Sequence, residues 1–271
     1  MRNYIAIICT LFLLTGCQTN QETLQQQLDQ LQEQNSQQEQ ENETLKQENE
    51  HLEQEVQRLN DENNQLTQKL EQFHRERISK LKEETGLVNI KDVDESIIID
   101  LRYATDNNFV NQQVYPVEVA LLQKDTAQKL KEANQRVKQD GYRIKVWDGY
   151  RPFDVQQVFW DLTPDKDYLA DPSHGSHHNR GAAVDVTLVD EQGNEVEMPT
   201  GFDEFSERAW RSYQGNSEQA QKNMEYLTEV MVDSGFSTIS IEWWHYNDSQ
   251  AKSYPVLNEP LENFVMESPS K

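Results

Sequence analysis

The chain has 271 residues and a formal net charge of −23, with 48 Asp and Glu residues against 25 Lys and Arg residues. This length allows one ordinary domain plus an extended segment. The acidic balance argues against nucleic-acid binding, because phosphates attract basic side chains, and against a polybasic membrane patch. Both cysteines, Cys9 and Cys17, lie within the first seventeen residues. A metal site in the remainder of the chain must therefore be formed by His, Asp or Glu.

The first twenty residues, MRNYIAIICTLFLLTGCQTN, predict a secretory signal. Arg2 precedes an apolar run that is short for a bilayer span, and small residues follow. The stretch LTGC, Leu14 to Cys17, resembles the bacterial lipoprotein signal. That resemblance implies a signal peptide over residues 1–17 and lipidation of Cys17 as the mature N-terminus. The alternative is an uncleaved membrane anchor with an incidental cysteine. Either way we expect an extracytoplasmic protein attached to a bacterial membrane, and a lipid would anchor it without a spanning helix.

Residues 21–77 are rich in Gln, Glu and Asn and contain neither Gly nor Pro. A disordered acidic linker is one interpretation. Heptad periodicity favours a parallel coiled-coil dimer instead, because Leu at d with buried Asn at a fixes register and oligomeric state. The d positions hold Leu24, Leu31, Gln38, Leu45, Leu52, Leu59, Leu66 and Phe73, and the a positions hold Leu28, Asn35, Asn42, Asn49, Val56, Asn63 and Leu70.

We therefore predict a coiled-coil spacer over residues 18–85 that forms a homodimer through residues 21–77. At 1.5 Å per residue, residues 21–77 reach roughly 80 Å, enough to hold the following domain off a membrane. A single solvated helix is the alternative.

Residues 86–271 have the mixed composition of one globular domain. Strands are predicted in ESIIIDLRYAT (95–105), YRIKVWDGYRP (142–152), AAVDVTLVD (182–190) and STISIEWWHYN (237–247). Helical spacing follows Pro116 until Gly141, with Ala127, Leu130, Ala133 and Val137 on one face, and recurs from Ser217 to Ser234. This order predicts an α+β fold with a mostly antiparallel sheet and flanking helices.

Asp185 interrupts an apolar strand in HGSHHNRGAAVDVTL, residues 174–188. Its side chain points away from the face of Val184 and Val186, and a buried carboxylate needs a partner. His178 lies seven residues earlier, across a loop in which Gly181 permits a tight turn. These two side chains could hold a metal together.

The segment EWWHYN supplies Glu242 and His245. Residues three apart point to opposite faces of a straight strand, so the two meet at one site only if the strand bends or ends there. His178, Asp185 and His245 give the three protein ligands of a catalytic zinc site. Glu242 would then be the non-ligating acid that takes a proton from water.

These motifs resemble the D-Ala-D-Ala zinc metallopeptidases. SHHNRGAAVDVTL fits their Ser-x-His-x-x-Gly-x-Ala-x-Asp pattern and EWWHY their Glu-x-x-His element, while DLRYATDNNF and VWDGYRP look like the vancomycin-resistance-type D-alanyl-D-alanine dipeptidases in particular. The resemblance covers residues 90–250. It implies one zinc ion per chain held by His178, Asp185 and His245, and Glu242 as the catalytic base.

The same resemblance implies further roles. Arg151 matches an arginine that stabilises the tetrahedral intermediate, and Asp148 could orient it through a charge-assisted hydrogen bond. Ser176 matches the motif serine near the substrate. Asp203 is a candidate to hold the free ammonium group of the substrate, with Glu204 as its rival.

Three functions are compatible with these observations. The first is hydrolysis of the D-Ala-D-Ala dipeptide to two D-Ala by a membrane-anchored enzyme. The second is a D,D-carboxypeptidase that trims the terminal D-Ala from peptidoglycan stem peptides, which the expected extracytoplasmic location favours. The third is a non-enzymatic cell-wall-binding lipoprotein, which has no need of a general base such as Glu242.

Overall fold

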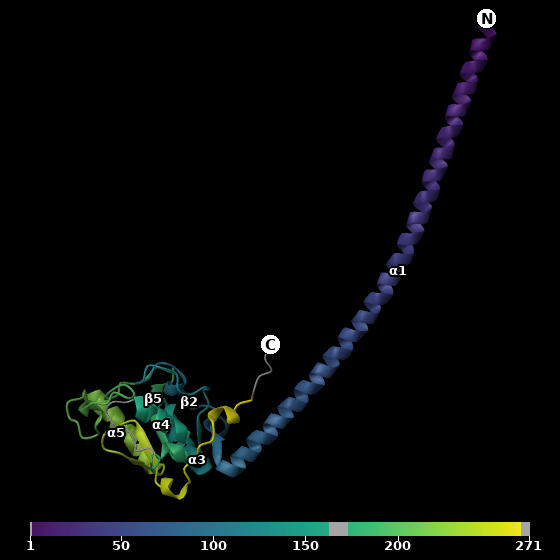
Figure 1. The fold of residues 1–271 in the computed structure, drawn as a ribbon. Coiled ribbons are helices and arrows are strands. Elements are labelled where there is room, and N and C mark those ends of the chain that lie inside the picture. The colour runs from purple at the N-terminus through teal and green to yellow at the C-terminus, as the bar shows by residue number, and fades with distance from the viewer. Residues whose placement is uncertain (1, 163–172, 267–271) are drawn as a thin grey trace. The chain divides into compact units, whose positions relative to one another are not determined.

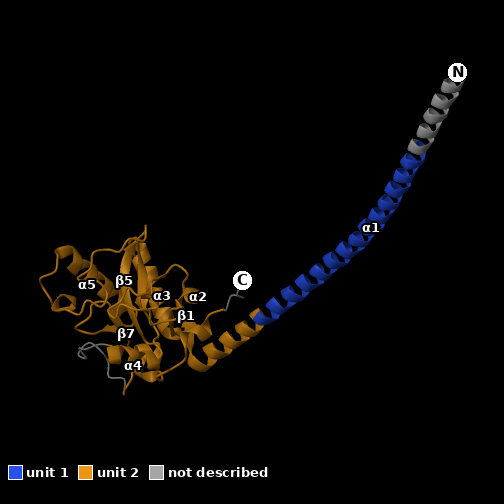
Figure 2. Ribbon diagram, turned by 45° about the horizontal axis from the view of Figure 1, so that its top comes forward, with its two compact units in different colours: residues 1–70 blue, residues 71–271 orange. Residues whose placement is uncertain are grey.

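The computed structural model describes residues 2–162 and 173–266, and for residues 2–20 it describes the backbone only. The predicted signal peptide over residues 1–17 and the lipidation of Cys17 therefore lie outside the described side chains. Two compact units make up the chain, Met1–Leu70 and Glu71–Lys271 (Figure 2). Within the residues whose side chains are described, no helix carries an apolar stretch long enough to cross a membrane.

The first unit is part of one long helix, α1 (Arg2–Thr85) (Figure 1). Side-chain pairs four residues apart support it, such as Gln57 to Asp61 at 3.0 Å. The apolar residues of the heptad positions are 43% to 68% exposed in the single chain: Leu24, Leu28, Leu31, Leu45, Leu52, Val56, Leu59, Leu66 and Leu70.

The second unit begins with the last turns of α1, where Leu81 packs against the hydrophobic core. The helix ends before Gly86, whose φ of +75° is the left-handed conformation that glycine adopts at helix C-termini. A short antiparallel pair follows, β1 (Leu87–Asn89) with β3 (Leu121–Gln123). The brief helix α2 (Ile90–Val93) lies between these strands in the sequence.

The main sheet has five strands in the order β2-β4-β5-β7-β6. These are β2 (Ile98–Ile99), β4 (Tyr142–Asp148), β5 (Ala183–Asp190), β7 (His245–Asp248) and β6 (Phe236–Thr238). β2 runs parallel to β4, and the other neighbours are antiparallel. The α+β prediction is confirmed, but the sheet is mixed rather than mostly antiparallel. The reason is the long connection through α3 between β2 and β4, which permits a parallel pairing.

Helices cover one face of this sheet. α3 (Lys124–Gln139) packs on β4 and against α5 (Glu218–Asp233), which also contacts β6. Val184, Val186 and Leu188 of β5 join the core with the apolar residues of these two helices. Asp185 points to the opposite face, as the alternation of a strand requires. The sequence did not predict the β1–β3 pair or the helix α4 (Phe153–Leu162).

Candidate active site

Three buried polar residues lie in one row across the sheet. Asp185 of β5 is paired with Asp148 at the end of β4 and with His245 at the start of β7. All three side chains are nearly inaccessible to solvent. The strand order β4-β5-β7 therefore brings together side chains that are far apart in the sequence.

His178 reaches the same place from a loop. It begins the short 3-10 helix His178–Arg180, which ends at Gly181 with a φ of +64°. A side chain at Gly181 would be strained at this φ and would meet Leu87. The predicted tight turn is thus present. His178 Nδ1 lies 2.8 Å from the main-chain oxygen of Gly149, which can only accept, so this nitrogen carries the ring proton.

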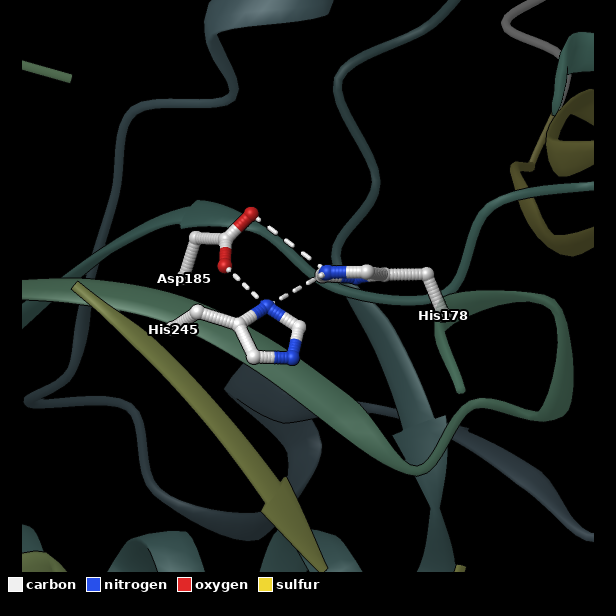
Figure 3. Close-up of side chains that lie close together, drawn as sticks. All are labelled: His178, Asp185 and His245. Atoms are coloured by element: carbon white, nitrogen blue, oxygen red, sulfur yellow. Dashed lines mark hydrogen bonds and ion pairs between the residues drawn. The ribbon is translucent and has the colours of Figure 1, made fainter. Parts of the chain in front are cut away.

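The donor atoms of His178, Asp185 and His245 converge (Figure 3). His178 Nε2 lies 3.4 Å from Asp185 Oδ2 and 3.3 Å from His245 Nδ1, and His245 Nδ1 lies 2.9 Å from Asp185 Oδ1. Because its Nδ1 is protonated, His178 directs a lone pair at this cluster. Two imidazole nitrogens and a carboxylate in such an arrangement fit a divalent cation, and this donor set suits zinc.

Glu242 stands beside the cluster without joining it. Its Oε2 lies 3.9 Å from His245 Nδ1. The predicted single strand over residues 237–247 is wrong: β6 ends at Thr238, β7 begins at His245, and Glu242 lies in the loop between them. The strand therefore starts where the two side chains must meet. Burial raises the pKa of the Glu242 carboxyl above its ordinary value, which suits a group that takes and returns a proton.

Asp148 and Arg151 form a buried ion pair of 2.7 Å. Asp148 also accepts hydrogen bonds from the Tyr115 hydroxyl at 2.7 Å and the Gly149 amide at 2.9 Å. Burial disfavours the charged guanidinium, but Asp148 outweighs it and keeps the pKa of Arg151 well above its usual range. Arg151 Nε has no hydrogen-bond partner among the described residues, so the cation keeps one donor uncommitted.

Asp203 lines the same pocket and accepts a 2.8 Å hydrogen bond from the Tyr103 hydroxyl. Burial raises the pKa of its carboxyl well above the usual range. Its φ of +57° is rare outside glycine, asparagine and aspartate. Glu204, the rival candidate, is exposed and lies 3.7 Å from Arg208. Of the two candidates, Asp203 lines the pocket that also contains His178, Asp185 and His245.

Ser176 lines the pocket, but its hydroxyl is engaged within the loop. It donates to Asn179 Oδ1 at 3.0 Å and accepts from the Asn179 amide at 3.2 Å. The Asn179 side chain in turn donates to the main-chain oxygen of Arg151 at 2.9 Å. In the described structure Ser176 thus shapes the segment that carries His178, and its predicted contact with substrate stays a prediction.

The pocket around these residues has a volume of about 470 Å³. Its apolar wall consists of Phe109, Phe205, Ile239, Ile241 and Trp244. The sequence did not indicate two further residues of the site. Tyr103 donates to Asp203 and contacts the ring of Phe109 edge-on, and Asn247 contacts His245. Tyr103 stands within the quoted DLRYAT motif, but nothing in its spacing indicated a contact with a residue one hundred positions away.

The chain was compared with known families, curated proteins and solved structures. The family model described as D-Ala-D-Ala dipeptidase matches residues 83–267. A D-alanyl-D-alanine dipeptidase of Escherichia coli K12 is 35% identical over 185 residues, 68% of this chain and 96% of that protein. One from Enterococcus faecium is 29% identical and covers 69% of this chain and 100% of that protein. A crystal structure of a vancomycin-resistance D,D-pentapeptidase with Zn(II) has a TM-score of 0.32 and 18% identity, covering 49% of this chain and 78% of that one.

Proposed function

The chain belongs to the D-Ala-D-Ala dipeptidase family of metallopeptidases, and we propose that it hydrolyses the D-Ala-D-Ala dipeptide to two D-Ala with one zinc ion per chain. The convergence of His178, Asp185 and His245 beside Glu242 is the observation that carries this proposal. Three protein ligands are the number found in catalytic zinc sites, which keep a fourth position for water or substrate. When bound, the ion supplies a Lewis acid at this point of the pocket.

Each remaining side chain has a distinct part in the proposed reaction. Glu242 takes a proton from the attacking water and returns it to the leaving amine, for which its raised pKa is suited. Arg151 stabilises the negative charge that develops on the carbonyl oxygen. Asp148 holds this guanidinium through the 2.7 Å ion pair, so the cation needs no reorganisation during the reaction.

Asp203 sets the substrate length in this proposal. A dipeptide carries a free ammonium group next to its scissile bond, whereas a stem peptide continues as a chain. A half-buried carboxyl group that lines the pocket and accepts a hydrogen bond from Tyr103 suits an ammonium partner, because a partly desolvated charge is stabilised by an opposite charge. The apolar rings of Phe109 and Phe205, 5.5 Å apart between centroids, line the same pocket.

The activity test is D-Ala release by the purified, zinc-loaded protein from the free dipeptide and, in parallel, from a stem pentapeptide. We expect release from the dipeptide and loss of release in the Glu242→Gln variant. Release from the pentapeptide instead would assign the protein to trimming of wall peptides. Zinc binding without release from either substrate would favour a wall-binding module.

We further propose that the protein is lipid-anchored through Cys17 outside the cytoplasm, and that residues 21–77 pair two chains in a parallel coiled coil. The LTGC motif supports the anchor. The exposed apolar heptad positions of α1 support the pairing, because a helix with such a stripe gains free energy by burying it against a partner. Metabolic labelling with a palmitate analogue, lost in Cys17→Ser, tests the anchor.

A further inference from the structure

His245 has a second ring nitrogen, and this nitrogen is held by Asn247. His245 Nε2 lies 2.9 Å from Asn247 Oδ1. Two residues apart on β7, the side chains point to the same face of the sheet. An amide oxygen can only accept, so His245 must present an N–H at Nε2. A neutral imidazole then carries its lone pair at Nδ1, the atom that faces Asp185 and His178.

The same amide oxygen has a second donor. His177 Nδ1 lies 2.7 Å from Asn247 Oδ1, and the backbone oxygen of His177 accepts from the amides of Arg180 and Ala182. The main chain of His177 is thus held within the loop that carries His178, and its ring contacts Asn247. Because Asn247 Oδ1 can only accept, His177 donates its Nδ1–H to this oxygen, which thus takes a hydrogen bond from each imidazole.

Burying these polar side chains costs free energy of folding. Three of the four residues of β7 are buried polar residues, His245, Asn247 and Asp248. Asp248 has structural partners in Thr126 at 2.6 Å and Lys129 at 2.5 Å. Asn247 Oδ1 instead contacts two histidine rings, those of His177 and His245. Burying an amide costs free energy that an apolar residue at this position would not.

We propose that Asn247, held by His177, is a positioning residue that fixes the tautomer and orientation of His245 for metal binding. The inference deepens the proposed zinc-dependent function and rests on it. Outer partners of this kind orient a ligand ring and raise its basicity, and their loss costs about 10- to 100-fold in metal affinity. Removing the acceptor frees His245 to carry its proton at Nδ1, where the metal must bind.

The test compares zinc dissociation constants by chelator competition on the full chain. Asn247→Leu removes the acceptor at similar size and should raise the zinc dissociation constant about 10- to 100-fold. Asn247→Asp restores an acceptor oxygen and should recover most of the affinity. His177→Leu leaves the acceptor but frees its orientation, so its loss should be smaller than that of Asn247→Leu. The visible spectrum of the Co²⁺-loaded protein should change in the same order.

Asn134→Leu is the matched control. Asn134 is also buried and its amide contacts Asp94 and Ser96 at 2.8 and 3.0 Å, away from the pocket. This variant should lower the unfolding temperature and leave the zinc dissociation constant unchanged. Zinc affinity of Asn247→Leu within twofold of the wild-type value would overturn the positioning role, while a wild-type chain that binds no zinc would overturn the metal proposal itself.

Discussion

Arg211 holds the main chain of His245. Its guanidinium donates to the main-chain oxygens of His245 at 3.1 Å and Trp243 at 2.7 Å, and its Nε donates to that of Ile239 at 2.9 Å. One side chain therefore holds two carbonyl groups of the loop that carries Glu242 and the first carbonyl group of β7. The spacing of the EWWHYN motif does not indicate this contact, because Arg211 lies outside the motif.

Replacing Arg211 with Lys should lower kcat by about 10- to 100-fold, because an ammonium group cannot reach three carbonyls at once and small displacements of catalytic groups are costly. Steady-state kinetics on the dipeptide measures this. Arg143→Lys is the control, since the Arg143 guanidinium donates to the main-chain oxygen of Glu191 at an exposed turn. Unchanged kcat in Arg211→Lys would show that the loop holds its shape without the clamp.

The Asp148–Arg151 pair predicts a combined effect on stability and activity. Asp148→Asn leaves the buried Arg151 charge without its ion-pair partner, which should cost about 3–5 kcal/mol of unfolding free energy and reduce kcat. Tyr115→Phe removes only the hydroxyl that donates to Asp148 and should cost about 1 kcal/mol. Denaturant unfolding of both variants measures the difference, and equal losses would argue against a decisive role for the charge.

Replacing Asp203 with Asn should raise stability and lower activity. Its pKa is raised in the folded protein, so the folded state binds more protons than the unfolded state above the ordinary carboxyl pKa, and stability falls as pH rises toward the raised pKa. Asp203→Asn removes this loss and suits the positive φ of +57°. The variant should therefore unfold at a higher temperature at neutral pH.

The same variant should bind the dipeptide poorly. In the wild type KM should fall as pH rises through the Asp203 pKa, because only the carboxylate pairs with the substrate ammonium; Asp203→Asn should show a raised KM without that pH dependence. KM measured at a series of pH values, from the ordinary carboxyl pKa upward, tests this, with Glu204→Gln as the control because Glu204 is exposed. A normal KM in Asp203→Asn would assign the ammonium to another group.

Local sequence signals predicted much of this site. The parts that depend on contacts between distant segments of the chain were not predicted. The turn at Gly181 and the inward direction of Asp185 follow from backbone preferences and strand alternation, which are local. The loop between Thr238 and His245 could not be predicted, because Arg211 stabilises it from a distant segment. The parallel pairing of β2 with β4 is likewise set by tertiary structure, because a strand of two residues has no periodicity that would indicate its partner or direction.

The apolar stripe of α1 predicts the oligomeric state. Leu52 and Leu59 share the d position and are 52% and 50% exposed in the single chain, so a parallel partner would bury both. Replacing both with Asp should convert a dimer into a monomer in sedimentation experiments, because charges at the seam must be desolvated.

Gln54→Asp adds a charge at an exposed position outside the seam and should leave the dimer intact. The activity per chain should stay unchanged in both variants, since all the proposed ligands and catalytic groups belong to the unit Glu71–Lys271. A wild-type chain that sediments as a monomer at micromolar concentration would contradict the pairing and leave α1 as a single solvated helix.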